Sequence, residues 1–466
     1  MAFDIAIVNA SIVVPKAGII NTNIAIKDGK IVEFTPDEVE ANRRIDAEGL
    51  YALPGVIDPH VHYGVYTSID KDAETESRSA AIGGVTTMMR MFRLYDSYRE
   101  KLKTHLDASE RSHIVDYGYH ASILIPEHVN EIDYCINNGI TSFKLYMNLK
   151  GKLGSIYMDM DPYTNKLITQ NVNVDDVLVR SAIKTAAVHN ALVLIHAEDP
   201  DICNLEMEKA LEQKKDGLDV WSECRPSKSE HDTIIKISAW ARENKCKLYL
   251  PHIGSSAAID AIIDERNNGT ELFVETCPHY LTHSTDFQNV IAKVVPPLRS
   301  KKDVQRMWEA LRDGTVNCIG TDHVANILEM KRGDDDIWSA LAGFPGIATM
   351  LPVLLSEGVN KGRIKMEKVA ALTSLNAAEI FGIFPRKGTI AIDSDADIVL
   401  VDLEKEQKVT PDLLQSHSDY TIYDGMTLKG WPVITIVRGQ IVMEDGQVVG
   451  KPGYGKFVAR STRSKS

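Results

Sequence analysis

Short apolar runs alternate with helix-like segments through the middle of this 466-residue chain. Parallel strands that are buried on both faces give such runs, and a helix returns the chain from each strand to the next. In one such helix, Ser255 or Ser256 offers an N-cap and Gly269 a stop signal. Eight runs predict a distorted (β/α)8 barrel. An open doubly wound sheet is the alternative, but it would carry a glycine-rich phosphate turn after its first strand, and none is present. The runs are Val56–His62, Val85–Met91, Tyr117–Leu124, Ile140–Met147, Leu192–Glu198, Lys247–Ile253, Leu272–Cys277 and Asn317–Asp322.

Both ends of the chain show β-strand patterns. Ile5–Val8 and Ile24–Ile26 precede an Asp-Gly hairpin dipeptide near the N-terminus, and Ala396–Val401 precedes Ile434–Val437 near the C-terminus. We predict one small β-sandwich built from both termini, with the barrel inserted into it. The expected boundaries are residues 1–52 and 385–450 for the two parts of the sandwich and 53–384 for the barrel. Residues 451–466 are expected to form a basic tail that is mobile or covers a partner.

Composition narrows the class of protein. A content of 44% hydrophobic and 25% charged residues indicates a folded chain, not a disordered one, a collagen or a coiled coil. The net charge of −13 argues against a broad nucleic-acid surface. No apolar stretch approaches the ~20 residues that span a bilayer, and the start lacks a signal-peptide pattern. The 6 cysteines are scattered without a CxxC pair. We therefore expect a cytoplasmic protein with reduced thiols and neither a nucleic-acid nor a membrane partner.

A His-Val-His sequence ends the first predicted barrel strand. Because side chains alternate along a strand, His60 and His62 point to the same side, into the mouth of the barrel. Two imidazoles this close form a metal-ligand pair, and Asp58 or a backbone carbonyl is placed to select their tautomer. Taken alone, the pair is equally compatible with two surface histidines.

Three later strands end in residues of the same chemistry. His196 and His252 each follow an apolar strand, and Asp322 ends the last one. Each histidine by itself could be a packed core residue. In a barrel, however, all strand ends meet on one face, where active sites are built. The order of these residues therefore predicts a metal centre on that face.

Lys144 lies inside the fourth apolar strand, where an unpaired ammonium group is unfavourable. It could reach a carboxylate instead. Beside two divalent cations, a neutral amine can also take up CO₂ and become a carbamate that bridges both metals, because the cations stabilise the new charge. We therefore predict that Lys144 is a candidate bridging ligand.

The chain resembles the binuclear-metal amidohydrolase superfamily, and within it the cyclic amide hydrolases: dihydropyrimidinases and hydantoinases, with allantoinases close by. The similarity covers nearly the whole chain and is specific for superfamily and reaction type more than for substrate. The end of the chain, from Gly388 to Asp397 and from Gly450 to Gly455, is most like hydantoinases. The other matching stretches are Leu53–His62, Gly83–Thr87, Ser142–Lys144, His196–Glu198, Glu275–Leu281, Pro296–Arg299 and Thr321–His323.

The resemblance implies a ligand set and a reaction. His60, His62 and Asp322 would hold the more buried metal and His196 and His252 the other, with N6-carboxylated Lys144 and a hydroxide between them. The hydroxide would attack the carbonyl of a small cyclic amide, while Asp322 acts as base and then as acid. Zinc is the first expectation for both metals, and manganese, cobalt, iron and nickel suit the same donors. By resemblance the protein should be a homotetramer or a homodimer.

The substrate side departs from the hydantoinase pattern. The stretch Met147–Gly151 after Lys144 has no tyrosine at the place where hydantoinases carry one to stabilise the oxyanion, so Tyr157 or Tyr163 in the long segment 151–173 is the candidate replacement. Ala342 stands near the place of a usual asparagine, whose backbone meets the substrate. Arg93 follows the second strand, where it could recognise a carboxylate or another polar substituent. The remaining candidate substrate-binding residues are Thr276, His279 and His323, of which the two histidines look more like allantoinases.

Several alternatives stay open from the sequence. A hydantoinase or dihydropyrimidinase is favoured over an allantoinase or a hydrolase of another cyclic amide, imide or lactam. The absence of an arginine directly after His62 weakens a dihydroorotase assignment. A deaminase, a decarboxylase or a hydrolase of acyclic amides would keep the metals, although Lys144 argues against a mononuclear deaminase. A non-catalytic scaffold homologue is more remote, because every ligand position is intact.

Overall fold

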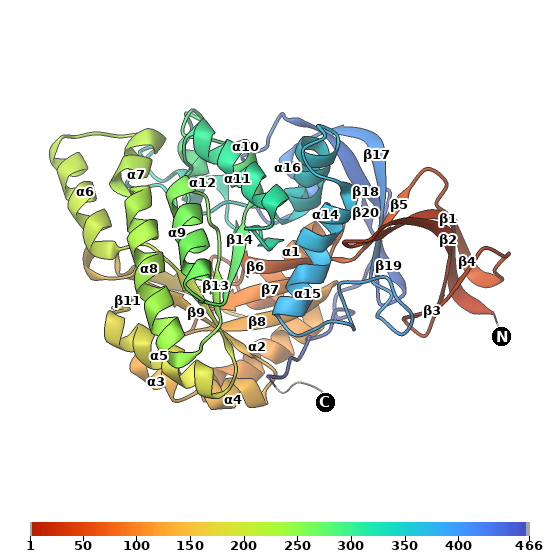
Figure 1. Ribbon diagram of the computed structural model, residues 1–466, viewed down its shortest axis with the longest axis horizontal. Coiled ribbons are helices and arrows are strands. Elements are labelled where there is room, and N and C mark those ends of the chain that lie inside the picture. The colour runs from red at the N-terminus through yellow and green to blue at the C-terminus, as the bar shows by residue number, and fades with distance from the viewer. Residues whose placement is uncertain (1, 463–466) are drawn as a thin grey trace.

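The computed structural model describes residues 2–462 and forms a closed parallel barrel beside an antiparallel sheet (Figure 1). The first seven predicted runs each form one barrel strand. The eighth, Asn317–Asp322, contains the short strand β15, and a second short strand, β16, begins directly after it. Strand β15 pairs with β14 and β16 with β6, which closes the barrel. The barrel strands are β6 (Val56–His62), β7 (Val85–Phe92), β8 (Asp116–Ser122), β9 (Ser142–Tyr146), β12 (Leu192–His196), β13 (Leu248–Leu250), β14 (Leu272–Thr276), β15 (Cys318–Ile319) and β16 (His323–Val324).

Helices cover the outside of the barrel, which is why the apolar runs could be read as strands buried on both faces. In Figure 1, α5, α8 and α9 lie side by side in front of the strands. The predicted N-cap is confirmed, because the hydroxyl of Ser255 accepts the N–H of Ala258 at the start of α9. The longer helices are α1 (Ile69–Ile82), α2 (Tyr98–Ser112), α5 (Asp176–Val188), α6 (Pro200–Glu212), α7 (Leu218–Cys224), α8 (Ser227–Asn244), α9 (Ser256–Asn267) and α11 (Lys301–Asp313).

Short helical turns connect these elements. They are α3 (Pro126–Val129), α4 (Ile132–Asn137), α10 (Pro278–Thr282), α12 (Leu328–Arg332), α13 (Met350–Val353), α14 (Met366–Ala370), α15 (Asn376–Ile380) and α16 (Pro411–Leu414). Three 3₁₀ turns (Gly151–Leu153, Val290–Ala292 and Ile347–Thr349) and two π turns (Leu354–Val359 and Ala371–Leu375) complete the helical structure of the described residues.

The two ends of the chain form one β-domain, as predicted. Its nine-stranded sheet, called the terminal sheet below, joins the ends where β5 pairs with β17 in antiparallel register, with Leu53 opposite Val399. Alternating isoleucines such as Ile7, Ile26 and Ile398 form its own apolar core. Its strands are β1 (Phe3–Val14), β2 (Gly18–Lys27), β3 (Lys30–Thr35), β4 (Ala41–Asp46), β5 (Tyr51–Pro54), β17 (Ile398–Lys408), β18 (Thr427–Val437), β19 (Gln440–Glu444) and β20 (Gln447–Val448).

A buried ion cluster joins the barrel to the terminal sheet. Lys387 is 2% exposed, and its ammonium group lies 2.7 Å from Asp116, 2.6 Å from Asp397 and 3.2 Å from Asp395. The three carboxylates are close enough to suggest a metal site. The ammonium group already occupies the space between them, so the cluster is structural.

Lys387→Met should lower the free energy of unfolding by about 3–5 kcal/mol, because it leaves buried carboxylates without their cation. Calorimetry would show a lower unfolding midpoint. Lys361→Met, which removes only an exposed ion pair with Glu357, should leave the midpoint nearly unchanged. Equal midpoints for the two variants would contradict the structural role of the cluster.

The described part of residues 451–466, which we expected to be mobile or to cover a partner, packs on the barrel of its own chain. Tyr117 donates its backbone N–H to Lys456 (3.0 Å), and Val458 donates in turn to Tyr117 (2.7 Å). Val458 and Arg460 are buried, and the Arg460 guanidinium donates to the hydroxyl of Ser142. The expectation rested on the basic residues of the tail and did not take account of one apolar segment, which pairs with β8. Residues 463–466 lie outside the described part.

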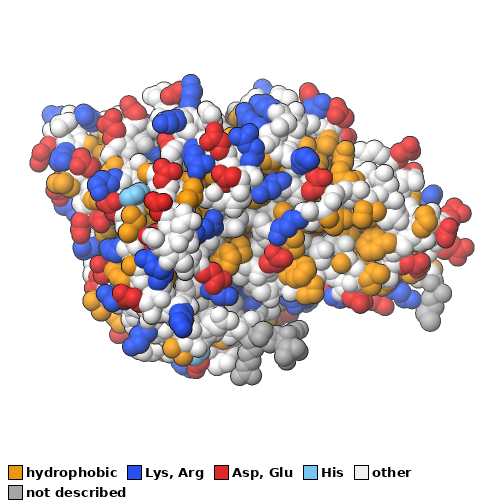
Figure 2. Space-filling view, in the orientation of Figure 1, with side chains coloured by type: hydrophobic (Ala, Val, Ile, Leu, Met, Phe, Trp, Pro, Cys, Tyr) orange, Lys and Arg blue, Asp and Glu red, His pale blue; other side chains and the backbone are white. Residues whose placement is uncertain are grey.

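The surface agrees with the composition. Side chains of both charges are scattered over the face in Figure 2, and apolar ones gather over the terminal sheet, where Ile19 and Ile20 are 44% and 55% exposed. Within residues 2–462, every helix is too short or too polar to span a bilayer. All six cysteines are buried and unpaired.

Candidate metal centre

A cavity of about 360 Å³ opens at the carboxyl ends of the barrel strands. The backbone places the predicted donors there because β6, β9 and β12 end at the same edge of a parallel sheet. The six predicted ligands all line this cavity: His60, His62, Lys144, His196, His252 and Asp322.

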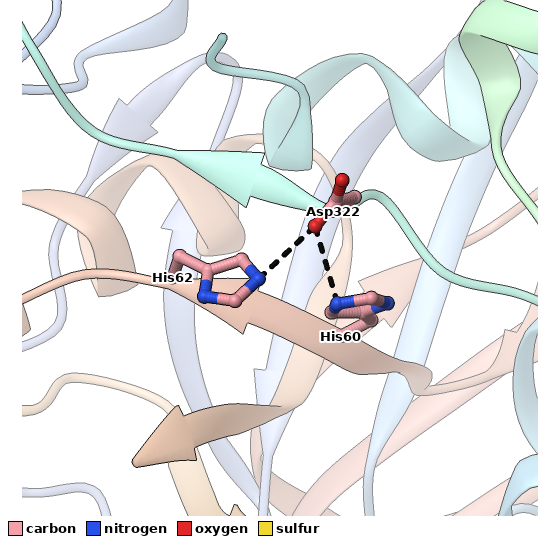
Figure 3. Close-up of side chains that lie close together, drawn as sticks. All are labelled: His60, His62 and Asp322. Atoms are coloured by element: carbon pink, nitrogen blue, oxygen red, sulfur yellow. Dashed lines mark ion pairs between the residues drawn. The ribbon is translucent and has the colours of Figure 1, made fainter. Parts of the chain in front are cut away.

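The first group of donors joins the two ends of the barrel sheet (Figure 3). His60 and His62 come from β6, and Asp322 from the break between β15 and β16. Oδ1 of Asp322 lies 3.1 Å from Nε2 of His60 and 3.1 Å from Nε2 of His62. Burial lowers the pKa of both imidazoles well below the usual value, so both are neutral and keep a lone pair for a cation.

The second group consists of His196 at the end of β12 and His252 just after β13. Nδ1 of His196 lies 3.0 Å from Nε2 of His252. Nε2 of His196 lies 2.5 Å from Glu198, and Arg225 binds the same carboxylate through two N–H groups, at 3.0 and 2.7 Å. A carboxylate behind an imidazole is the usual way in which a metal-binding histidine is oriented.

A buried carboxylate also orients the first group. Nδ1 of His60 lies 2.8 Å from Glu275, which in turn accepts the hydroxyl of Tyr249 (2.6 Å) and the backbone N–H of His252 (3.0 Å). Glu275 therefore connects both histidine groups. Burial raises its pKa to about 8, despite the hydrogen bonds that oppose the shift. Asp58, the residue predicted to fix a tautomer, instead accepts two backbone N–H groups, from His60 and Thr321.

Lys144 lines the same cavity as the two groups, and its charge acts on the histidines of both. It is fully buried in the middle of β9, and its Nζ has no hydrogen-bond partner in the described protein. Burial lowers its pKa to about 8, which favours the neutral amine that can form a carbamate. The donor set of four imidazoles, one carboxylate and one unpartnered amine fits two divalent ions.

Two of the donors have left-handed backbone conformations. His252 has φ 45° and Asp322 has φ 52°. Such conformations are unfavourable by about 1–3 kcal/mol for residues other than glycine, and they concentrate at functional sites. Here they turn the side chains into the cavity at points where the strands end.

Three of the predicted substrate residues line the cavity: Arg93, Tyr157 and Ala342. Tyr157 comes from a hairpin of β10 (Ser155–Met158) and β11 (Ile168–Asn171) within the long segment after β9, and its ring lies 5.3 Å from that of Tyr66. Tyr163 is 64% exposed and its hydroxyl accepts N–H groups from Arg111, so it does not reach the cavity.

The other three predicted substrate residues do not line the cavity. The hydroxyl of Thr276 donates to the carbonyl of Ile253 (2.6 Å). The ring of His279 packs on Tyr280 and Phe344. Direct contact with substrate is therefore not supported for either of these two residues.

His323 is also directed away from the cavity. Its Nε2 lies 2.9 Å from Glu76, and its Nδ1 accepts the N–H of Gly346 (3.0 Å). Asp322 lies in the break before β16 with a left-handed backbone, whereas His323 is the first residue of β16, so the two side chains take different directions. His323 thus holds the segment that carries Asp322.

Sequence reasoning missed part of the cavity wall. Tyr66, Tyr146, Trp221 and Lys293 also line it. Lys293 donates to the carbonyl of Ala340 (2.6 Å) and so helps hold the loop that carries Ala342. Tyr66 and Tyr146 lie close to the ligand motifs and could have been proposed, whereas the others depend on loops without a pattern.

Comparison with known proteins agrees with this geometry. The model of the amidohydrolase family matches residues 51–442. The chain belongs to the amidohydrolase family. This amidohydrolase is 32% identical to a D-hydantoinase from Ralstonia pickettii over 98% of its length and 99% of the relative. It is 31% identical to an L-hydantoinase from Paenarthrobacter aurescens, with 98% of each chain covered. The crystal structure of a dihydropyrimidinase from Brevibacillus agri matches with a TM-score of 0.89 and 29% identity over 99% of both chains. The family and the barrel predicted from the sequence are confirmed.

Proposed function

We propose that this amidohydrolase opens a cyclic amide ring of the hydantoin or dihydropyrimidine type. The observation that carries the proposal is the convergence of six donor side chains on one cavity. The names of relatives that align over nearly the whole chain support the substrate class. A panel of hydantoin, dihydrouracil and allantoin, scored for ring opening, deamination and decarboxylation, tests it. Turnover by deamination or decarboxylation alone would overturn it.

The two groups of donors suit two ions. His60, His62 and Asp322 would hold one, His196 and His252 the other, and Lys144, as its N6-carboxylated form, would stand between them. In carboxylation Nζ forms a bond to the carbon of CO₂ and loses a proton, which leaves a carbamate anion. Zinc is the first candidate metal, and manganese, cobalt, iron and nickel accept the same donors. When bound, such ions polarise the scissile carbonyl and acidify a water molecule.

The protein's own groups supply the proton transfers and the orientation. Asp322 is the carboxylate that lines the cavity. It would take the proton of the attacking water and return it to the ring nitrogen as the C–N bond breaks. Glu275 and Glu198 keep His60 and His196 in one tautomer and orientation. No covalent acyl intermediate is required.

Tyr157→Phe should lower kcat by about 10²–10³-fold, because Tyr157 lines the cavity and is the candidate donor to the oxyanion. Steady-state kinetics on hydantoin measures this effect, and metal content should not change. Tyr163→Phe is the matched control, since that hydroxyl is bound to Arg111 outside the cavity, and it should behave as wild type. If only Tyr163→Phe lost activity, the assignment would have to be reversed.

The assembly and the location are also proposals. Buried, unpaired cysteines suit the reducing cytoplasm. Exposed apolar side chains suit a homotetramer or a homodimer. They lie on the terminal sheet (Ile19, Ile20) and on α5, where Val177 and Val188 are 76% and 79% exposed. Sedimentation equilibrium of the purified chain would give the number of subunits, and a monomer at micromolar concentration would contradict the proposal.

A further inference from the structure

The cavity contains one guanidinium group that forms no ion pair with the described residues. Arg93 follows β7 and lines the cavity. Its Nε is buried and has no hydrogen-bond partner, and no carboxylate of residues 2–462 forms an ion pair with it. A charged group in such a place is unfavourable unless something pairs with it.

The neighbouring carboxylate is engaged elsewhere. Asp159 accepts the backbone N–H of Arg93 (2.9 Å) and donates its own N–H to the Arg93 carbonyl (3.0 Å). Its carboxylate forms an ion pair with Arg90, at 2.8 Å, whereas the Arg93 guanidinium, from beyond ion-pair distance, only opposes the rise in the pKa of Asp159 that burial causes. Asp159 therefore holds the backbone of Arg93 in place and leaves its side chain to the cavity.

The other fixed cations of the wall are satisfied. Arg225 binds Glu198 through two N–H groups, and Lys293 donates to two backbone carbonyls, of Trp338 and Ala340. Arg93 acts on the first donor group. Burial is the main cause that lowers the pKa of His62, and the charge of Arg93 is the next largest. It also opposes the rise in the pKa of Tyr66 and Tyr146 that burial causes. The guanidinium thus lies near His62 and near the phenol rings of Tyr66 and Tyr146 in the cavity wall.

A cation in this position opposes the binding of divalent ions, and an anionic group on the substrate would offset that repulsion. Arginine presents N–H groups in a planar fork that matches a carboxylate. We propose that Arg93 binds a carboxylate carried by the cyclic amide, so that the substrates are carboxylate-substituted hydantoins or dihydropyrimidines. The inference rests on the proposed function and names the substrate class of the same site.

A matched pair of ligands tests the inference in the full-length, metal-loaded enzyme: hydantoin-5-acetate and hydantoin-5-acetamide, which have nearly the same shape and differ in charge. Wild type should favour the acetate in kcat/KM by roughly 10- to 100-fold. Arg93→Gln should abolish this preference, and Arg93→Lys should keep part of it. Arg78→Gln removes a half-buried arginine of α1 that pairs with Glu74, and it should retain the full preference.

Binding gives a second readout that does not depend on turnover. Trp221 and Trp338 line the cavity, so their fluorescence reports its occupation. The acetate should bind wild type about 10- to 100-fold more tightly than the acetamide, and Arg93→Gln should bind both equally. Equal affinities in wild type, or a preference that survives Arg93→Gln, would overturn the inference.

Ring opening of neutral hydantoin with no preference for the acetate would leave the proposed function intact and remove only this inference. Failure to open any ring would remove the proposed function, while the binding data would still decide the role of Arg93.

Discussion

Lys144→Ala is expected to lose both metal ions and at least about 10³-fold in kcat/KM. Lys144 is the proposed bridging ligand, and its charge acts on all four imidazoles. Removal of its Nζ leaves no bridging anion between two cations, whose mutual repulsion is then uncompensated. The loss of activity reflects the loss of the carbonyl polarisation and of the acidified water.

Elemental analysis of wild type and variant, together with ring-opening rates on hydantoin and dihydrouracil, measures this effect. Wild type should contain about two metals per chain after reconstitution with bicarbonate, and mass spectrometry of the intact native protein should show the added CO₂. Lys184→Ala, an exposed lysine on α5, is the matched control and should retain both metals. Fewer than one metal in wild type, unchanged by Lys144→Ala, would exclude the binuclear centre and favour the scaffold alternative.

The barrel and its ligands were predictable from the sequence because both depend on local periodicity. Strands buried on both faces are apolar along their whole length, and parallel strands bring their carboxyl ends together whatever the loops between them do. The position of His60, His62 and His196 at strand ends was therefore sufficient to bring them into one cavity.

The conformations of His252 and Asp322 were not predictable, because their left-handed φ values arise where a strand is interrupted. The same break explains why adjacent residues, Asp322 and His323, have different roles. Irregular loops supply the other residues of the cavity wall. The sequence therefore offered Tyr157 and Tyr163 as equal candidates. In the structure Tyr157 lines the cavity, whereas Tyr163 binds Arg111 outside it.

The buried polar partners were also beyond the sequence. Glu275 and Glu198 occur in matching motifs, yet their role depends on contacts with residues far along the chain, such as Arg225 and Tyr249. The packing of the tail on β8 was likewise not predictable. It depends on one apolar pair, Phe457–Val458, inside a segment that is otherwise basic.

Asp322→Asn is expected to lower kcat by about 10²–10⁴-fold, the range for the loss of a general acid–base. The amide keeps the size of the side chain and an oxygen for the first donor group, but it can neither accept nor return a proton. His196, His252 and Lys144 are not changed, so metal should be retained in the second group. Asp201→Asn, an exposed aspartate of α6 that pairs with Lys150, is the matched control and should keep wild-type kinetics.

A series of cyclic amides graded by the acidity of the leaving nitrogen separates the two roles of Asp322. A nitrogen that leaves readily needs little help from an acid, so Asp322→Asn should lose least on the most acidic members and most on simple lactam-like rings. An equal loss across the series, together with loss of metal from the first group, would indicate that Asp322 serves only as a ligand. A loss below tenfold with both metals retained would indicate that another group carries the proton. The phenols that line the cavity, Tyr66 and Tyr146 among them, would then be the next residues to replace.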